Sequence, residues 1–243
     1  MPYIKETYTC GAYVEIRKYY SSRYGKKGVK RGPYREPTNE EMELINERNA
    51  AKKLCRLIET NFTYGDYHIV LTYRKGDRPG KEEAIKRRDK FLRKLRSAYK
   101  AFDGELKYIS VTEKEARSIH HHLIVNACDP QIIQEAWPWG HVHLTPLYDE
   151  GRYEDLADYL IKETRRTFRS KDRIQGKRWT ESRNLKQPDI RKEVIKADSW
   201  REKPRVPKGY FLDADSLRTG SHSFMGYAYQ EYRLVKIQDR KKE

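Results

Sequence analysis

The sequence predicts an α+β fold, because helical and strand-like patterns both occur along the chain. Two long segments, 39–60 and 82–100, repeat apolar residues at helical spacing. Shorter runs rich in β-branched and aromatic residues follow them and are bounded by turn-forming residues. Two of these runs are separated only by the polar stretch 114–118, which indicates a hairpin connection.

The first half of the chain contains two predicted helices and one strand. The helix over 39–60 follows a capping-box pattern, in which Thr38 precedes Glu41 by three residues. Residues 67–73 predict a largely buried strand, since the run is short and closed by Gly and Pro. The helix over 82–100 has one apolar face among many basic residues, so we expect it to cover a sheet.

The second half continues with strands and two further helices. The strands are expected over 106–113, 119–126 and 141–145. Asp129 as an N-cap and Pro130 at the first helical position predict a short helix over 131–136. Another helix is expected over 153–169. Residues 163–208 carry 16 basic and 7 acidic side chains with few signals of regular structure, so most of that segment is left unassigned.

The composition favours one domain with a polyanionic partner. A chain of 243 residues suits a single elaborated domain, and its 52 Lys and Arg against 36 Asp and Glu give a formal net charge of +16. The 19 tyrosines are a heavy aromatic load for so polar a chain. Rings that stack on bases, together with cations that meet phosphates, favour single-stranded nucleic acid. A basic surface kept for solubility is the alternative.

Several other classes of protein are not indicated. Cys10, Cys55 and Cys128 are widely spaced, which predicts neither a disulfide framework nor a thiolate zinc site. No apolar run approaches the roughly 20 residues of a membrane span, and the N-terminus lacks a signal-peptide core, so a cytoplasmic location is expected. Residues 76–81 lack the spacing of a phosphate-binding loop, which argues against an attached ATP-driven helicase.

Three consecutive histidines open the strand over 119–126. Strand alternation places His120 and His122 on one face and His121 on the other. Two imidazoles on one face can share a divalent cation, and Glu113 or Glu115 across the hairpin could complete the site. The alternative is that the histidines are simply polar residues at the exposed beginning of a strand.

The helix over 153–169 presents a tyrosine away from its apolar stripe. The stripe consists of Ala157, Leu160, Ile161, Thr164 and Phe168, and the opposite face carries Asp155, Tyr159, Lys162 and Arg166. Tyr159 with Lys162 one turn later suits a reactive phenol, although an exposed tyrosine on a basic helix is the plainer interpretation. A phenol with a pKa near 10 is a poor nucleophile at neutral pH, so attack on a phosphodiester needs help. A histidine-bound cation could polarise the phosphate while Lys162 stabilises the developing negative charge.

These motifs, in this order, resemble those of the HUH endonuclease superfamily, specifically its rolling-circle replication-associated proteins. Residues 69–73 resemble the family's hydrophobic strand ending in Leu-Thr-Tyr, 120–122 its histidine pair, and 159–162 its Tyr-x-x-Lys motif. Glu113 resembles a carboxylate that often precedes the histidine pair as a third metal ligand. The family usually has a bulky apolar residue where this chain has His121, so a ligand register through His121 is an alternative.

The resemblance covers roughly residues 8–190 and carries implications for fold and activity. It implies an antiparallel sheet of about five strands with helices packed on it, the histidine strand central and the tyrosine helix alongside. The implied protein is a replication initiator that nicks single-stranded origin DNA, hairpins included, using Mg or Mn. Tyr159 and Lys162 would be catalytic, and His120, His122 and Glu113 would bind the metal. A 5′-phosphotyrosine and a free 3′ hydroxyl would result, with helicase and polymerase as separate partners.

Other functions remain open at this point. A relaxase or transposase would use the same chemistry, and a hydrolytic metal nuclease would not need Tyr159. A non-catalytic module could present three tyrosines for base stacking, namely Tyr67, Tyr73 and Tyr108. His141 and His143 are further candidate site residues, more often structural.

The resemblance implies a single nicking domain over 1–243 with three parts. Residues 60–170 would form the catalytic core. Residues 1–37 are interpreted as a basic, tyrosine-rich N-terminal arm or strand, and 171–243 as a basic C-terminal extension. Between Arg17 and Arg35 there are eight basic residues and no acid, which favours a flexible arm along a phosphate backbone. This arm and the basic segment after residue 163 are expected to carry the preference for a DNA sequence.

Overall fold

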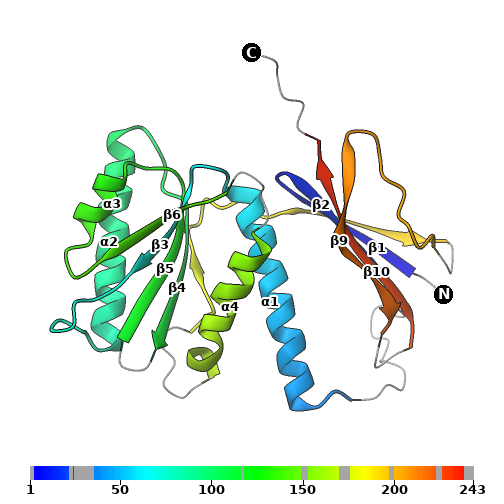
Figure 1. The fold of residues 1–243 in the computed structure, drawn as a ribbon, viewed down its shortest axis with the longest axis horizontal. Coiled ribbons are helices and arrows are strands. Elements are labelled where there is room, and N and C mark those ends of the chain that lie inside the picture. The colour runs from blue at the N-terminus through cyan, green and yellow to red at the C-terminus, as the bar shows by residue number, and fades with distance from the viewer. Residues whose placement is uncertain are drawn as a thin grey trace. The chain divides into compact units, whose positions relative to one another are not determined.

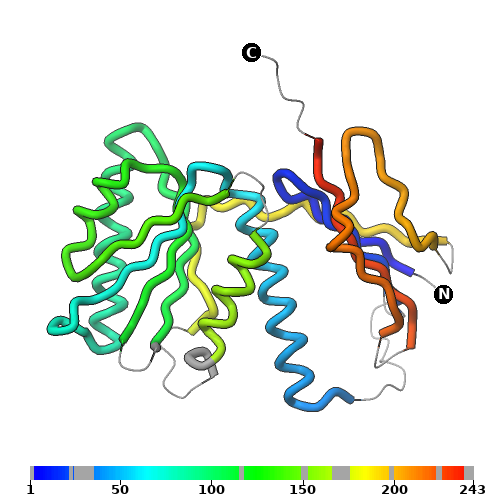
Figure 2. Tube along the Cα trace, viewed as in Figure 1, coloured from blue at the N-terminus to red at the C-terminus, as the bar shows by residue number. Residues whose placement is uncertain are grey.

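The chain forms two compact units, each built on a five-stranded sheet (Figures 1 and 2). In the computed structural model the described residues are 3–21, 24, 36–115, 118–148, 153–169, 176–196, 200–222 and 226–237, without the side chains of 115 and 166–169. One unit, here called the inserted unit, spans residues 47–186. The other, the split unit, combines residues 1–46 with 187–243. The prediction of a single domain did not anticipate this division.

The inserted unit has the α+β architecture that the sequence predicts. Its strands are β3 (Tyr67–Leu71), β4 (Tyr108–Glu115), β5 (Ser118–Val125), β6 (Val142–Pro146) and β7 (Thr180–Glu181). The strand order is β6-β3-β5-β4-β7, every neighbouring pair is antiparallel, and the histidine strand β5 is central. Its helices are α2 (Lys81–Ala101), α3 (Pro130–Ala136) and α4 (Glu154–Arg169), together with α1 (Asn39–Asn61), which begins in the split unit and continues into the inserted one. The predicted sheet of about five strands with packed helices is therefore confirmed.

Helices cover both faces of this sheet. On one face, Ile109, Val111 and Ile124 form a buried cluster with side chains of α1 and α4. On the other, Ile69, Leu123 and Val125 belong to a cluster with α2 and α3 (Figure 1). Each fully buried aliphatic side chain stabilises the fold by about 1.5–3 kcal/mol, so both clusters fix the helices against the sheet. The α4 face is the one on which alternation places His120 and His122.

Local signals in the sequence place several helix ends correctly. At the start of α1, the Glu41 amide donates to the Thr38 hydroxyl over 3.2 Å and the Thr38 amide donates to the Glu41 carboxylate over 2.8 Å. This is the reciprocal capping box. At α3, the Asp129 carboxylate accepts from the Gln131 amide over 2.8 Å, and Pro130 occupies the first turn. Both predicted caps are therefore confirmed.

The split unit contains the strands that sequence patterns did not reveal. They are β1 (Tyr3–Cys10), β2 (Tyr13–Tyr20), β8 (Asp189–Ile195), β9 (Tyr210–Ser221) and β10 (Ala228–Lys236), in the antiparallel order β8-β1-β2-β10-β9. The interpretation of 17–35 as a flexible arm is wrong for residues 17–20, which lie in β2. Residues 22, 23 and 25–35 lie outside the described part of the chain.

Paired charges explain why these strands escaped detection. The Arg17 guanidinium contacts the Glu231 carboxylate over 2.8 Å, and Lys5 contacts Glu193 over 2.8 Å. Cross-strand charge pairs replace much of the apolar alternation by which a strand is usually recognised. The basic composition of 171–243 is therefore compatible with regular strands.

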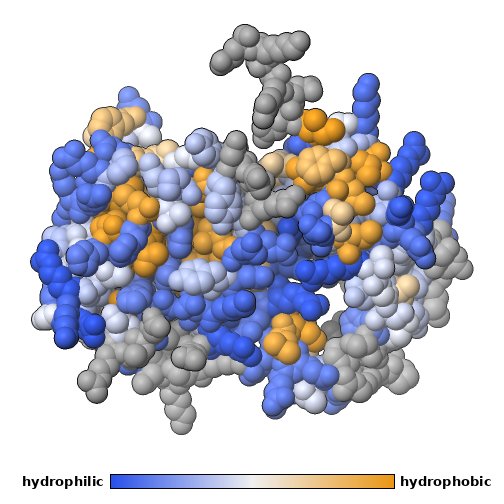
Figure 3. Space-filling view, in the orientation of Figure 1, coloured by the Kyte–Doolittle hydropathy of each residue, from blue (hydrophilic) through white to orange (hydrophobic). Residues whose placement is uncertain are grey.

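Neither a disulfide nor a membrane-spanning helix occurs among the described residues. Cys10, Cys55 and Cys128 are free thiols. Among the described residues, no helix combines the length and apolar character needed to cross a bilayer. The visible face of the protein is largely hydrophilic, with smaller groups of hydrophobic residues between the charged ones (Figure 3).

Candidate active site

Glu113 and two histidines converge on the α4 face of the sheet. The register of β4 and β5 pairs Glu113 with His120. The His122 Nε2 lies 2.8 Å from the Glu113 Oε1, and the His120 Nδ1 lies 3.7 Å from the same oxygen. Glu113 and His122 are 4% and 2% exposed, so this is a buried contact of a carboxylate with an imidazole. The predicted sharing of one face is thus what the structure shows.

His121 faces the opposite side and acts as part of the core. It is fully buried, its Nε2 lies 2.8 Å from the Tyr73 hydroxyl, and its Nδ1 lies 2.9 Å from the Thr112 hydroxyl. Burial holds the pKa of His121 well below its ordinary value. Both ring nitrogens are engaged on the α2 face, which argues against the alternative ligand register through His121.

Glu113 is held in its ionised form. Burial alone would raise the pKa of this carboxyl, but hydrogen bonds with His120, His122 and Glu163 outweigh burial and place the pKa well below its ordinary value. Glu163 comes from α4, four residues after Tyr159, so it lies on the same side of that helix as the tyrosine. The sequence analysis did not select Glu163, because its approach to Glu113 depends on how α4 docks on the sheet.

Tyr159 stands beside the histidines. Its ring centroid is 5.5 Å from that of His122, with the two rings at 75°, and its side chain is 42% exposed. The buried stripe of α4 includes Ala157, Leu160 and Ile161, as predicted, and fixes the helix on the sheet. The side chains of Arg166 and Phe168 lie outside the described part. The phenol is therefore both open to solvent and close to the buried imidazole.

Lys162 is exposed on α4, three residues after Tyr159. This spacing puts the two residues about one turn apart on a helix. The structure thus places Lys162 near the rim of the site and not within its buried part.

His68 is a third histidine of this face, and the sequence analysis missed it. His68 lies in β3 opposite Ile124 of β5, and Val70, two residues later in β3, lies opposite His122. Its ring stacks on that of His122 with centroids 5.6 Å apart and lies 6.4 Å from that of Tyr159. Burial, with a smaller contribution from His122, lowers the pKa of His68 to about 4. Only the register between β3 and β5 reveals this neighbour.

Two buried ring nitrogens in this cluster lack a hydrogen-bond partner within the described residues. They are the Nε2 of His68 and the Nδ1 of His122. A buried polar atom without a partner carries a desolvation cost of about 1–3 kcal/mol, so such atoms mark a place where a water molecule, ion or substrate group is expected.

The remaining candidate residues lie at the margin. His143 is exposed and pairs with Val70 in the neighbouring strand, so it shares the face of His122 at the edge strand β6. His141 is exposed just before β6, and its carbonyl accepts from the Thr72 amide. The side chain of Glu115 lies outside the described residues, so its comparison with Glu113 stays a prediction.

The candidate donor atoms are one carboxylate and two imidazoles. Carboxylate oxygens are ligands that Mg and Mn prefer, whereas imidazole nitrogens are more typical ligands of Zn, Cu, Fe and Ni. The Glu113 Oε1 lies 2.8 Å from the His122 Nε2 and 3.7 Å from the His120 Nδ1. Two neighbouring ligand atoms of an octahedral ion, each about 2.1 Å from it, lie about 3 Å apart, which is between these two distances. Within the described ranges, however, no three or more His, Cys, Asp or Glu side chains are already arranged as a complete metal site. The Mg or Mn site expected from the sequence therefore stays a prediction.

A known family spans this site. Residues 66–164 match the family of the replication-associated protein ORF2/G2P. The matched range includes β3, β5 and most of α4, and with them His68, His122 and Tyr159. The predicted likeness to a rolling-circle replication initiator is therefore confirmed, over a shorter stretch than the expected 8–190. Comparisons with curated proteins and with solved structures found no match. The matched family is described as replication-associated, and the match covers 99 of the 243 residues.

Proposed function

We propose that this chain initiates rolling-circle replication by nicking single-stranded origin DNA with Tyr159 as the nucleophile. The observation that carries this proposal is the contact of the Tyr159 ring with His122, which is itself bonded to Glu113. It brings a solvent-accessible phenol beside a buried pair of the kind that binds metal. The match to a replication-associated family supports the biological setting.

The proposed reaction exchanges one phosphodiester bond for another. The Tyr159 oxygen loses its proton and attacks the scissile phosphorus, and the bond from phosphorus to the 3′ oxygen breaks. The departing oxygen takes up a proton and becomes a 3′ hydroxyl from which a polymerase can extend. The 5′ phosphate stays attached to the tyrosine, and this linkage conserves the bond for later rejoining.

The chain's own residues divide the remaining tasks. Glu113, His120 and His122 would hold Mg²⁺ or Mn²⁺, which when bound polarises the scissile phosphate. The hydrogen bond between Glu113 and His122 fixes the orientation of that imidazole. We assign to Lys162, one turn from Tyr159, the stabilisation of the charge that develops on the phenolate or the phosphate.

The product defines the partners of the reaction. Single-stranded DNA, in an extended or hairpin origin, is the proposed substrate. Extension of the 3′ hydroxyl needs a polymerase, and displacement of the old strand needs a helicase, both proposed as separate proteins. A relaxase or transposase would share the chemistry, so the substrate sequence that is cut distinguishes these roles.

The decisive test follows the covalent adduct. Labelled single-stranded oligonucleotides from the gene's own neighbourhood are incubated with the protein and Mn²⁺ or Mg²⁺ and resolved on a denaturing gel. We expect a metal-dependent adduct that is lost in Tyr159→Phe and in His120→Ala/His122→Ala. Tyr64→Phe is the matched control, because Tyr64 is 66% exposed in the same unit.

Other results would indicate other functions. Cleavage without an adduct that survives Tyr159→Phe would indicate a hydrolytic metal nuclease. Tight binding without cleavage on every origin-like substrate would indicate a non-catalytic binding module.

A further inference from the structure

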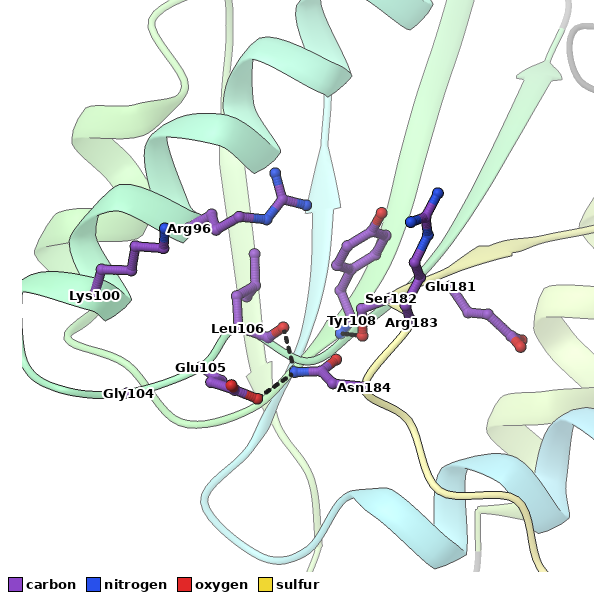
Figure 4. A pocket seen from close by; sticks show the side chains of 10 residues that line it. All are labelled: Arg96, Lys100, Gly104, Glu105, Leu106, Tyr108, Glu181, Ser182, Arg183 and Asn184. Carbon is purple, nitrogen blue, oxygen red and sulfur yellow. Dashed lines mark hydrogen bonds between the residues drawn. The ribbon is translucent and has the colours of Figure 1, made fainter.

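A second site candidate lies on the other face of the sheet in the inserted unit. It is a pocket of about 520 Å³ between the C-terminal half of α2, the beginning of β4 and the residues around β7 (Figure 4). Tyr108 in this lining packs against the α2 cluster, whereas Glu113, five residues later in the same strand, faces α4. The pocket is therefore separate from the site of Tyr159, and its volume is typical of ligand sites.

The lining is rich in cations that have no acidic partner. Arg96 and Lys100 come from α2 and Arg183 from the segment after β7. The two carboxylates of the lining are engaged by neutral donors, Glu105 by the Asn184 amide and Glu181 by the Trp179 indole. In the part of the chain that the structure describes, no ion pair is recorded for the three cations. The two carboxylates keep their charge, so the lining carries a net charge of +1, and its three cations can contact an anion from outside the chain.

The positive charge continues along α2 beyond the pocket. From residue 90 to its end the helix contains no acid, and its exposed cations are Lys90, Arg93, Lys94, Arg96 and Lys100. A row of cations at successive helical turns matches a polyanionic backbone better than it matches a single small anion.

An aromatic ring and an apolar residue share the pocket with these cations. Figure 4 shows the Tyr108 ring beside Arg183, with the Arg96 guanidinium and Leu106 on the other side of the ring. The Tyr108 amide donates to the Ser182 hydroxyl over 3.0 Å, which ties β4 to the segment carrying Arg183. In proteins that bind single-stranded DNA, bases stack on aromatic rings and phosphates contact cationic side chains. This pocket offers both kinds of group.

We propose that this pocket binds one nucleotide of single-stranded DNA, with the base on Tyr108 and the neighbouring phosphates on Arg96, Lys100 and Arg183. The inference rests on the proposed function, since it concerns the same strand that Tyr159 cuts. Because the pocket faces away from the nicking site, it contributes to DNA affinity and leaves the chemical step unchanged.

The first test asks whether the cations of the pocket contribute to DNA affinity. Fluorescence anisotropy of the full chain with a labelled single-stranded oligonucleotide compares Arg96→Gln/Lys100→Gln/Arg183→Gln with Lys75→Gln/Arg78→Gln/Lys86→Gln. The second variant removes the same charge from three exposed cations of the same unit outside the pocket. We expect the pocket variant to bind at least about tenfold more weakly than this control, with a salt slope smaller by about 2, at about 0.7 per lost phosphate contact.

The second test examines the ring. Tyr108→Leu is expected to weaken binding severalfold, whereas Tyr108→Phe, which keeps the ring, binds like the parent. Irradiation of an oligonucleotide substituted with 5-iodouracil is expected to give an adduct that peptide mapping places at Tyr108.

Defined outcomes would overturn the inference. They are equal affinity of the two triple variants, equal binding of Tyr108→Leu and Tyr108→Phe, or an equal loss with duplex DNA, which would indicate only a basic surface. The Tyr159 adduct is measured separately at saturating DNA, where the pocket variants should react at the parental rate. A missing adduct in every protein would reject the nicking proposal, while the binding comparison would still decide the pocket.

Discussion

The Tyr159 ring meets the His122 imidazole edge to face, with centroids 5.5 Å apart and an angle of 75° between the rings. Such a contact contributes about 0.5–1.5 kcal/mol beyond the area it buries. It also joins α4 to β5, so the position of the phenol depends on the packing of the helix as well as on the tyrosine itself.

This contact separates the packing role of Tyr159 from its proposed chemistry. Tyr159→Phe keeps the ring, so we expect a melting temperature within about 2 °C of the parent by calorimetry. The same variant should form no adduct on a denaturing gel, because it lacks the attacking oxygen. Tyr159→Ala should lose both the adduct and some stability. An adduct that persists in Tyr159→Phe would exclude this residue as the nucleophile.

His121→Ala should affect stability more than His120→Ala does. The substitution removes hydrogen bonds to Tyr73 and Thr112 and opens a cavity in a fully buried position. We expect the free energy of unfolding in urea to fall by about 3 kcal/mol. His120→Ala, at a partly exposed position, is the control and should cost less than about 1 kcal/mol. Equal losses in the two variants would contradict the core role of His121.

Glu163→Gln should raise the metal concentration that adduct formation needs, although Tyr159 is still present. Its carboxyl is hydrogen-bonded to Glu113, and fewer carboxylates at a site lower its affinity for a hard cation. We expect the Mn²⁺ concentration for half-maximal adduct formation to rise about tenfold. Asp155→Asn, at an exposed position of the same helix, should leave this concentration unchanged. An unchanged value in Glu163→Gln would place its carboxyl outside the metal site.

Acidification should destabilise the inserted unit between about pH 6.5 and 4. The pKa of His68 is lowered to about 4 by burial and by His122, and that of His121 is also lowered. Between these values and the ordinary pKa near 6.5, the unfolded chain binds protons that the folded chain does not, so stability falls as pH falls.

For His68 the loss amounts to at most about 3 kcal/mol, at about 1.4 kcal/mol per pH unit. Urea unfolding at several pH values measures it, and His68→Phe, which does not titrate, should show a shallower slope. An identical slope in this variant would show that His68 does not contribute.

Gly140 is expected to tolerate no side chain. An added Cβ would lie 1.9 Å from the Thr72 carbonyl oxygen and 2.8 Å from the Tyr73 Cα, so the two backbones would have to separate. That separation would break the bond from the Thr72 amide to the His141 carbonyl. We expect Gly140→Ala to lower the free energy of unfolding by about 2–3 kcal/mol. Gly76→Ala, with nothing within 4 Å, should change it by less than about 1 kcal/mol. An unchanged free energy of unfolding in Gly140→Ala would show that the backbones after β3 and before β6 can separate without loss of stability.

Periodicity and capping were sufficient to predict most of the inserted unit. The apolar face of α2 and the Asp129 cap of α3 are local features of the sequence, and both appear where expected. The shared face of His120 and His122 follows from alternation within one strand. Each of these predictions needs only neighbours in sequence.

The missing features depend on contacts between distant segments. His68 joins the site only through the register of β3 with β5, and Glu163 only through the docking of α4. The strands of the split unit are stabilised in part by charge pairs such as Arg17 with Glu231. The sequence does not show which charged residue pairs with which across two strands. From the sequence alone, these strands are therefore interpreted as a basic arm and a basic extension.

The interruption of the split unit by the inserted one sets an order of events on the ribosome. The candidate site lies on a continuous stretch that is complete once residue 186 has been synthesised, whereas β2 must wait for β10, its neighbour in the sheet. β10 begins 208 residues after the end of β2, so at about 5–20 residues per second that wait lasts about 10–40 seconds, during which the edge of β2 that pairs with β10 stays unpaired. A chain that stalls before residue 228 would thus contain the whole inserted unit and expose an edge strand prone to aggregation.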